Sequence, residues 1–307
     1  MSFDESEKIK EFHPPKNYKT LFFVVILCSF CALILAILAS SLNQKQEEAK
    51  TVDRSKQLLI AARVLSYQNY FLIKEDNEYH PAVFDQNSDN LVETSEIRKA
   101  TQKEILYIYE KRVKPKLIDP KGNLVDFSTA GINYQKYLED NQKTGYASLK
   151  YKLIYLVYPN ASSSQISDST KPIGYVIPVN GMGLWDAIYG YLAVESNGDT
   201  VIGTTWYEQS ETAGLGANIA LPAWQEQFHN KVIFQKAPDG TTNFQRAQIG
   251  IIVVKGKVSE VYGSSPKSDS AVDGITGATL TGMGVTDAYR DVLKQYRPFL
   301  EKLAEGK

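Results

Sequence analysis

The stretch Asp273-Gly274-Ile275-Thr276-Gly277-Ala278-Thr279-Leu280-Thr281 combines small residues with three hydroxyl groups. Small side chains let backbone amides approach a ligand closely. Directly downstream, apolar residues recur at helical spacing: Val285, Ala288, Tyr289, Val292, Leu293 and Tyr296. The stretch therefore lies at the start of a predicted helix, where free N–H groups and the positive dipole end suit an anionic phosphate.

A threonine at this place has two interpretations. Its hydroxyl can cap the helix, because Ser, Thr, Asp and Gly are the ordinary residues of caps and turns. It can also be esterified to the phosphate itself. Asp273 is the only carboxylate near Thr279 in the sequence, and it either caps the turn or helps to activate that hydroxyl. The residues alone leave these alternatives open.

The bulk composition excludes several classes of protein. The 307 residues can form one large domain or two modest ones, and 43% hydrophobic with 22% charged residues is a globular composition. A net charge of −1 without a basic block argues against a nucleic-acid partner. His13, His80 and His229 are solitary, so no histidine-based metal site is expected.

An uncharged run from Leu21 to Leu42 predicts a membrane-spanning helix. Its length as a helix is about 33 Å, enough for a hydrocarbon core of roughly 30 Å. Cys28 and Cys31 lie inside this run and are interpreted as small apolar residues. A cleaved signal peptide is the alternative, but its apolar region is usually shorter. The flanking lysines and arginines are balanced, so charge does not decide the orientation.

Residues 1–20 are then expected to form a short tail, and residues 43–145 a helical lead-in of uncertain role. Apolar spacing predicts an amphipathic helix after the anchor, with Asp53 as its N-cap. A charged helix is predicted over 93–114, and a turn at Pro120-Lys121-Gly122-Asn123. No chemistry is assigned to this region.

From residue 146 onward the pattern predicts an antiparallel α+β domain with a closing C-terminal helix. Strands are expected over 149–158, 174–179, 189–195, 200–207, 231–235 and 248–254. No G-x-G-x-x-G follows a strand, so a Rossmann nucleotide site is not supported.

Two further stretches could carry chemistry. Gly181-Met182-Gly183-Leu184-Trp185 suits either a backbone that approaches a flat ligand or a tight turn with a core tryptophan. Glu211-Thr212-Ala213-Gly214-Leu215-Gly216 is either an ordinary polar loop or a loop whose amides point into a site.

These motifs together resemble the C subunit of the sodium-translocating NADH:quinone oxidoreductase. Thr276-Gly277-Ala278-Thr279 is similar to its S/T-G-A-T flavinylation motif, and residues 181–185 to its G-x-G-L-W segment. Residues 211–216 resemble E-T-P-G-L-G, with Ala213 in the place of proline, which removes a restraint on φ. The related G subunit of Rnf complexes commonly has histidine where this chain has Gln209.

The resemblance implies FMN covalently joined through its phosphate to the hydroxyl of Thr279. It implies a cofactor site made of Asp273, Thr276, Gly277, Ala278, Thr279, Leu184, Trp185, Glu211, Thr212, Leu215 and Gly216. Thr276 and Thr281 are expected to bond the phosphate or the turn, and no residue acts as a nucleophile in turnover.

The implied function is an electron relay in a membrane oxidoreductase complex. The implied partners are the other membrane subunits, a second flavin subunit among them, a flavin transferase during maturation, and membrane lipid. The implied location is the bacterial inner membrane, single-pass, with the large domain periplasmic. The alternatives are an Rnf G-type subunit and a membrane-anchored module that binds a ligand without redox work.

Overall fold

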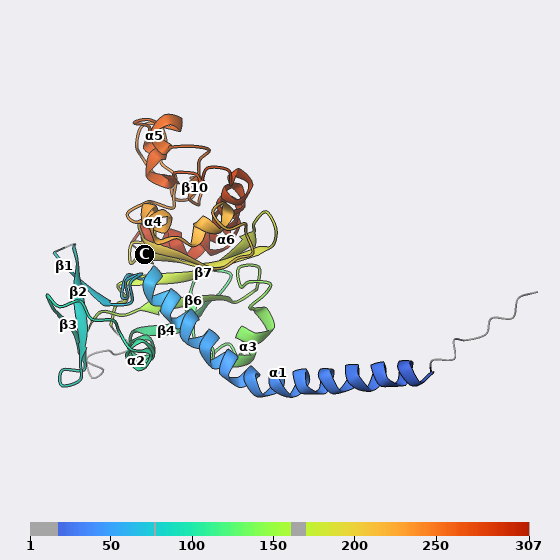
Figure 1. The fold of residues 1–307 in the computed structure, drawn as a ribbon. Coiled ribbons are helices and arrows are strands. Elements are labelled where there is room, and N and C mark those ends of the chain that lie inside the picture. The colour runs from blue at the N-terminus through green and yellow to red at the C-terminus, as the bar shows by residue number, and fades with distance from the viewer. Residues whose placement is uncertain (1–17, 77, 161–169, 307) are drawn as a thin grey trace, which may run out of the picture. The chain divides into compact units, whose positions relative to one another are not determined.

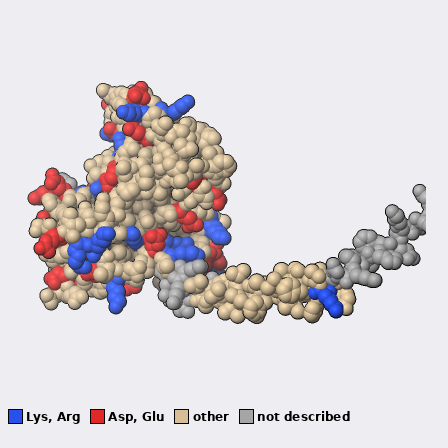
Figure 2. Space-filling model, viewed as in Figure 1, with Lys and Arg blue, Asp and Glu red and all other residues tan. Residues whose placement is uncertain are grey.

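A long apolar helix opens the described part of the chain. The computed structural model describes residues 18–76, 78–160 and 170–306, and it divides into two units, 1–51 and 52–307. Helix α1 spans Tyr18–Ala61, and its segment Tyr18–Leu42 is long and apolar enough to cross a membrane. Figure 2 shows that segment without charged atoms except near its N-terminal end. Most of the expected tail, residues 1–17, lies outside the described residues.

The expected second helix with Asp53 as its N-cap is wrong. Asp53 lies inside α1, because the sequence from Tyr18 to Ala61 contains neither glycine nor proline to break the helix. The helix ends instead at Ala61, shortly before Arg63, whose φ of 51° is left-handed. There the amide of Val64 donates to the carbonyl of Leu59, as in a helix C-terminal motif.

An antiparallel six-stranded sheet forms the centre of the second unit, in the order β5-β4-β6-β7-β8-β9 (Figure 1). Its strands are β4 (Val113–Ile118), β5 (Leu124–Val125), β6 (Lys152–Val157), β7 (Gly174–Met182), β8 (Ala187–Glu195) and β9 (Val201–Glu208). The first four of the predicted strands, over 149–158, 174–179, 189–195 and 200–207, are thereby confirmed as β6 to β9. Strands β4 and β5 come from before residue 146, where no strand was expected.

The region before this sheet has more structure than its sequence pattern indicates. Strands β1 (Phe71–Glu75), β2 (Glu78–Asp85) and β3 (Asn90–Glu93) form a separate antiparallel sheet. The helix predicted over 93–114 is shorter: α2 spans Gln102–Arg112 and starts at a capping box made by Thr101 and Glu104. Helix α3 spans Tyr134–Asn141. The predicted turn is confirmed, with Gly122 at a φ of 77°.

After β9 the chain is mostly irregular. Its short elements are η2 (Gly216–Ala220), α4 (Pro222–Gln225), η3 (Glu226–Phe228), β10 (Ile252–Val253), α5 (Val258–Val261), η4 (Pro266–Ser270) and β11 (Ala271–Val272). The strand expected over 231–235 is wrong, and that over 248–254 shrinks to β10 paired with β11. Isolated bridges at Val232 and Phe234 are what remains. The apolar side chains are buried there, but Gly250 at a φ of 124° interrupts an extended ladder.

The closing helix α6 spans Thr279–Ala304 and packs against β7. One hydrophobic core lies between the sheet and α6, and includes Trp206, Tyr289 and Tyr296. A second core lies on the other face, with the end of α1, α2 and α3. The fold is therefore the predicted α+β arrangement of an N-terminal apolar helix, an antiparallel sheet and a C-terminal helix.

A fully buried chain of hydrogen bonds fastens α6 to the sheet. The indole N–H of Trp206 donates to the Tyr289 hydroxyl over 3.1 Å. The Tyr289 hydroxyl lies 2.7 Å from the hydroxyl of Thr204, which in turn donates to the carbonyl of Tyr191. Each donor in this series of hydrogen bonds has an acceptor, which is the condition for burying polar groups without loss of stability.

Tyr289→Phe is expected to lower the free energy of unfolding by about 1–3 kcal/mol, because the buried indole N–H of Trp206 loses its acceptor. Thermal unfolding of the detergent-purified full chain, followed by circular dichroism, measures the change. Tyr262→Phe is the control, since Tyr262 is only half-buried and water can solvate its surroundings. Equal loss of stability in both variants would contradict this account.

Candidate functional site

One buried carboxylate joins the three motifs that the sequence analysis singled out. Glu211 follows β9 and is 8% exposed. Its Oε1 accepts the backbone N–H of Trp185 at 3.0 Å, and its Oε2 accepts the hydroxyl of Thr281 at 2.5 Å. Residues distant in sequence, on the β7–β8 turn, after β9 and on α6, therefore meet at one side chain.

The donors around Glu211 decide its protonation state. Burial by itself raises the pKa of this carboxyl group, but the hydroxyl of Thr281 and the amides of Trp185, Leu184 and Asp186 stabilise the charged form. Together they hold the pKa of Glu211 below its ordinary value of 4.5. The group is ionised at neutral pH and its charge is matched by directed donors.

Two glycines make room for this carboxylate. A Cβ on Gly183 would collide with Oε1 of Glu211. A Cβ on Gly216 would lie 2.5 Å from the Thr281 hydroxyl oxygen and 2.6 Å from Oε2 of Glu211. Gly216 is buried, so its contribution is space for the carboxylate, whereas residues 212–215 of this loop are exposed.

Trp185 lies on the surface and not in the core, so the alternative of a core tryptophan is wrong. Its side chain is 67% exposed, and its indole N–H donates to the hydroxyl of Thr212 at 3.1 Å. Further large apolar residues of the same motifs are exposed: Met182, Leu184, Leu215, Leu280 and Met283. Apolar surface in such density is typical of a face that contacts a ligand or a partner.

The three threonines of the 273–281 stretch have different environments. Thr276 and Thr279 are exposed, whereas Thr281 is 1% exposed and bonded to Glu211. Helix α6 begins at Thr279, and no side chain caps its N-terminus. The interpretation of these threonines as helix caps is therefore wrong. The positive end of α6 is left without a capping side chain beside an exposed hydroxyl.

A cavity of about 710 Å³ opens beside Thr279. Its wall includes Asp273, residues 274–279, Gly282 and Met283 on one side, and residues 253–257 on the other. Lys255 and Lys257 belong to this wall and were not predicted. Their Lys-Gly-Lys spacing is too short and common a signal to be recognised without the structure. Two cations beside an exposed hydroxyl and a helix N-terminus suit an anionic group.

The structure brings most of the expected site residues together. Leu215 lies against Gly277, since a Cβ there would be 2.9 Å from its Cδ2. Gly277 has a φ of 77°, a conformation that favours glycine, and Ala278 is buried. The expected residues of the two earlier motifs do not line the cavity itself: Leu184, Trp185, Glu211, Thr212, Leu215 and Gly216. Trp185 and Thr212 belong to an adjoining exposed surface, Glu211 is buried, and Leu215 links this surface to Gly277.

Asp273 makes hydrogen bonds within the protein through both its side chain and its backbone. Its Oδ1 accepts the amide of Val258 at 2.8 Å, where the short helix α5 begins. The backbone carbonyl of Asp273 accepts the indole N–H of Trp224. The backbone amide of Asp273 donates to the side-chain oxygen of Gln227. The carboxylate thus fixes the segment after Lys257 against the 273–279 stretch.

The class of domain follows from this region. A family model described as FMN-binding domain matches residues 183–294, a range that contains every expected cofactor-binding residue. The exposed apolar surface, the cations and the uncapped helix end are the features that such a ligand, with a flat ring and a phosphate, requires.

The particular family follows from whole-chain relatives. The chain is 38% identical to the C subunit of the Na(+)-translocating NADH-quinone reductase of Chlamydia caviae, over 98% of this chain and 96% of the relative. It is 40% identical to that of Chlamydia pneumoniae, over 91% and 89%. The chain belongs to the family of C subunits of the Na(+)-translocating NADH-quinone reductase, which confirms the resemblance inferred from its motifs.

Solved structures support the fold. The crystal structure of the C subunit from Parabacteroides distasonis has a TM-score of 0.52 and 22% identity, and covers 84% of this chain and 96% of that one. NqrC from Shewanella oneidensis has a TM-score of 0.50 and 24% identity, and covers 82% and 99%.

Glu211→Gln is expected to destabilise the chain by about 1–3 kcal/mol at pH 7, because an amide cannot accept all of the bonds that the carboxylate receives. Since the pKa of Glu211 is lower in the folded state, its contribution is complete above the ordinary value of 4.5 and is lost as the pH falls through the folded value.

Unfolding temperatures of the wild type and the variant, measured between pH 7 and pH 3, should therefore converge at the acid end. The control is Glu208→Gln, three residues earlier and exposed, which should follow the wild type throughout. A gap between wild type and Glu211→Gln that stays constant with pH would show that the charge of Glu211 is unimportant.

Proposed function

We propose that this chain is the FMN-carrying electron-relay subunit of a sodium-translocating NADH:quinone oxidoreductase. Membership of the C-subunit family and the match to the FMN-binding domain support this function. The observation that carries it in the structure is the exposed hydroxyl of Thr279 at the uncapped start of α6, in the wall of a cavity with two lysines.

The residues present fit both parts of FMN. The phosphate is an anion, and Lys255, Lys257 and the N-terminal end of α6 supply positive potential beside Thr279. The isoalloxazine ring is flat and largely apolar, and the exposed faces of Trp185, Leu184 and Leu215 offer matching surface. FMN, when bound, supplies the uptake and release of electrons, and the protein sets its position, potential and access to water.

The attachment point that we propose is Thr279, through a phosphoester. Thr281 is a poor candidate, since its hydroxyl is buried and donates to Glu211. Thr276 is exposed like Thr279, but it precedes the helix and is the first residue of the T-G-A-T motif, whereas the family motif joins the phosphate to the last. The β-branched side chain of Thr279 has few χ1 choices, which holds an ester in one direction.

Covalent flavin should depend on Thr279 alone. The full chain is expressed with a flavin transferase, denatured, and examined by gel fluorescence and peptide mass spectrometry. Thr279→Ala should lose all covalent fluorescence. Thr276→Ala should retain it, and Thr281→Ala should retain at least part of it while losing stability, because Glu211 loses a donor. A modified peptide whose fragments place the flavin on Thr276 or Thr281 refutes the assignment.

The surface around Trp185 should set the properties of the flavin without being needed for attachment. Trp185→Ala and Thr212→Ala both break the bond between the indole and the Thr212 hydroxyl. We expect covalent flavin in both variants, with a visible spectrum or midpoint potential different from the wild type. Leu124→Ala is the control, an exposed apolar residue on β5. Spectra and potentials equal to those of the control would remove these two residues from the flavin site.

We propose that the segment Tyr18–Leu42 anchors the chain in the bacterial inner membrane, in contact with lipid, and that the second unit is periplasmic. The partners are the other membrane subunits of the complex, a second flavin subunit among them, and a flavin transferase that acts before assembly. The names of the relatives favour this complex over an Rnf complex. The match to the FMN-binding domain disfavours a module without a redox cofactor.

A further inference from the structure

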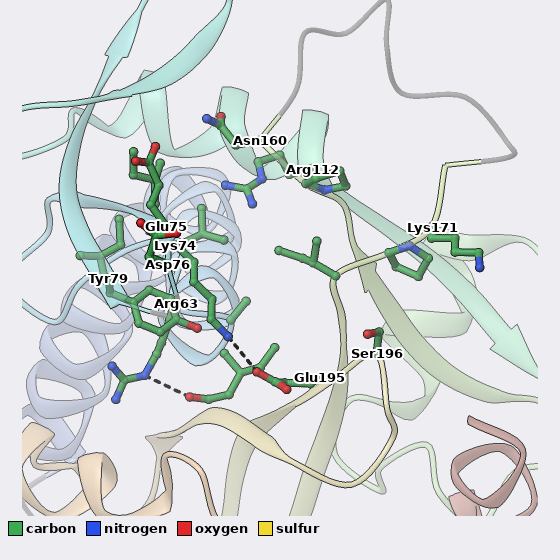
Figure 3. Close-up of a pocket in the computed structure, with 18 residues that line it drawn as sticks. Arg63, Lys74, Glu75, Asp76, Tyr79, Arg112, Asn160, Lys171, Glu195 and Ser196 are labelled. Carbon is green, nitrogen blue, oxygen red and sulfur yellow. Dashed lines mark hydrogen bonds and ion pairs between the residues drawn. The ribbon is translucent and has the colours of Figure 1, made fainter. Parts of the chain in front are cut away.

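A second cavity, of about 850 Å³, is lined by residues of β1 and β2 from the small sheet and of β8 and β9 from the large one, and Figure 3 shows its side chains. It shares no lining residue with the cavity beside Thr279. Its wall combines aliphatic side chains, among them Val64, Ile73 and Ile173, with a set of charged ones. The family match and the proposed electron relay make no use of it.

The cations of this wall differ in how they are neutralised. Lys74 is paired with Glu195 at 2.9 Å, and Arg63 is paired with Glu226. Arg112 has no carboxylate partner within the described ranges. It is nevertheless the most buried of the cations in this wall, with 4% of its surface exposed.

The neighbouring residue shows what an ordinary buried cation looks like in this fold. Lys111 is 9% exposed, and its ammonium group lies 3.2 Å from a carboxylate oxygen of Asp89 and 3.2 Å from the side-chain oxygen of Asn90. Among the residues that the structure describes, the guanidinium group of Arg112 has instead one hydrogen bond, from Nε to the carbonyl of Tyr158 at 3.0 Å. That bond uses one of the five N–H donors of the guanidinium group.

Different atoms of Arg112 therefore have different roles. Its Nε, together with its carbonyl, which accepts the amide of Tyr158 at 2.7 Å, fixes the end of β6. Its terminal amino groups are aimed into the cavity (Figure 3). Burial lowers the pKa of the guanidinium to about 10, yet the group stays charged at neutral pH. A buried charge without a partner is costly unless something binds it.

We propose that this cavity binds an organic oxyanion, with a carboxylate or phosphate group held by the terminal amino groups of Arg112 and an apolar body against the aliphatic wall. The planar fork of an arginine matches either oxyanion with two parallel hydrogen bonds. The ring of Tyr79, which already has Arg63 at 5.2 Å from its centre, adds a flat apolar surface to the wall.

The test separates the charged head from the apolar body. Phenyl phosphate, benzoate, inorganic phosphate and phenol are titrated by isothermal calorimetry into the detergent-purified full chain carrying its flavin. Phenyl phosphate, benzoate or both should bind saturably, and more tightly than inorganic phosphate or phenol. Which of the two anions binds better identifies the head group.

Three variants locate the site. Arg112→Lys keeps the charge but removes the fork, and should weaken binding by about tenfold or more. Ser196→Trp fills the mouth of the cavity from an exposed position without touching Arg112, so it should abolish binding in a folded chain even if Arg112→Lys is unstable. Lys103→Gln is the control, because this exposed lysine lies on the same helix as Arg112, α2, but lines neither cavity.

Two results overturn the whole proposal, and a third overturns its apolar part. The first is the absence of saturable binding of either aromatic anion up to about 10 mM, a concentration that detects even a weak site. The second is binding that Ser196→Trp leaves unchanged, which would place the anion elsewhere, for example beside Lys255. Inorganic phosphate that binds as tightly as phenyl phosphate would also refute the apolar body.

Discussion

The close approach of α6 to the β7–β8 hairpin is the constraint on which the fold and the site both depend. A Cβ on Gly181 would lie 2.5 Å from the Cβ of Ala288, and a Cβ on Gly284 would collide with the carbonyl of Met182. Real side chains do not tolerate such contacts, so these positions must be small for the helix to lie where it does. The distance set by them lets Tyr289 reach Trp206 and Thr204 inside the core.

The close approach of α6 to the β7–β8 hairpin also brings donors around a buried carboxylate. At the N-terminal end of α6, Thr281 comes within hydrogen-bond distance of Glu211, which also accepts the amide of Trp185. A carboxylate in this position is stable because two separate elements, the β7–β8 turn and α6, hold its donors in place, and the carboxylate in turn links both elements to the segment after β9. The hydrogen bond from the backbone amide of Trp185 to Glu211 thereby holds this residue at the surface, where two-thirds of its side chain is exposed.

The sequence allowed the long periodic elements and the site motifs to be predicted, but not what depends on tertiary contacts. Strands β6–β9 and α6 follow from apolar periodicity, and residues 181–185, 211–216 and 276–279 from their motifs. Strands β1, β2 and β4 mix apolar residues with charged residues or proline, and β3 and β5 have only four and two residues, so burial of their neighbours decides their pairing. Apolar residues at 231–235 predicted a strand, yet their side chains are buried without a ladder. Lys255, Lys257 and Arg112 gain their significance from cavities, which no local pattern encodes.

Helix geometry explains why two threonines so close in sequence have opposite roles. Successive residues of an α-helix are rotated by about 100°, so Thr279 and Thr281 are separated by about 200° and face opposite sides. Because Gly284 and Ala288 turn one side of α6 towards the β7–β8 hairpin, Thr281, which lies near that side, faces Glu211, and Thr279 faces outward. The packing that buries one hydroxyl is therefore what leaves the other exposed, next to Lys255 and Lys257 at the positive end of the helix. A modification site at Thr279 would thus be a consequence of the same small-residue contact that closes the fold.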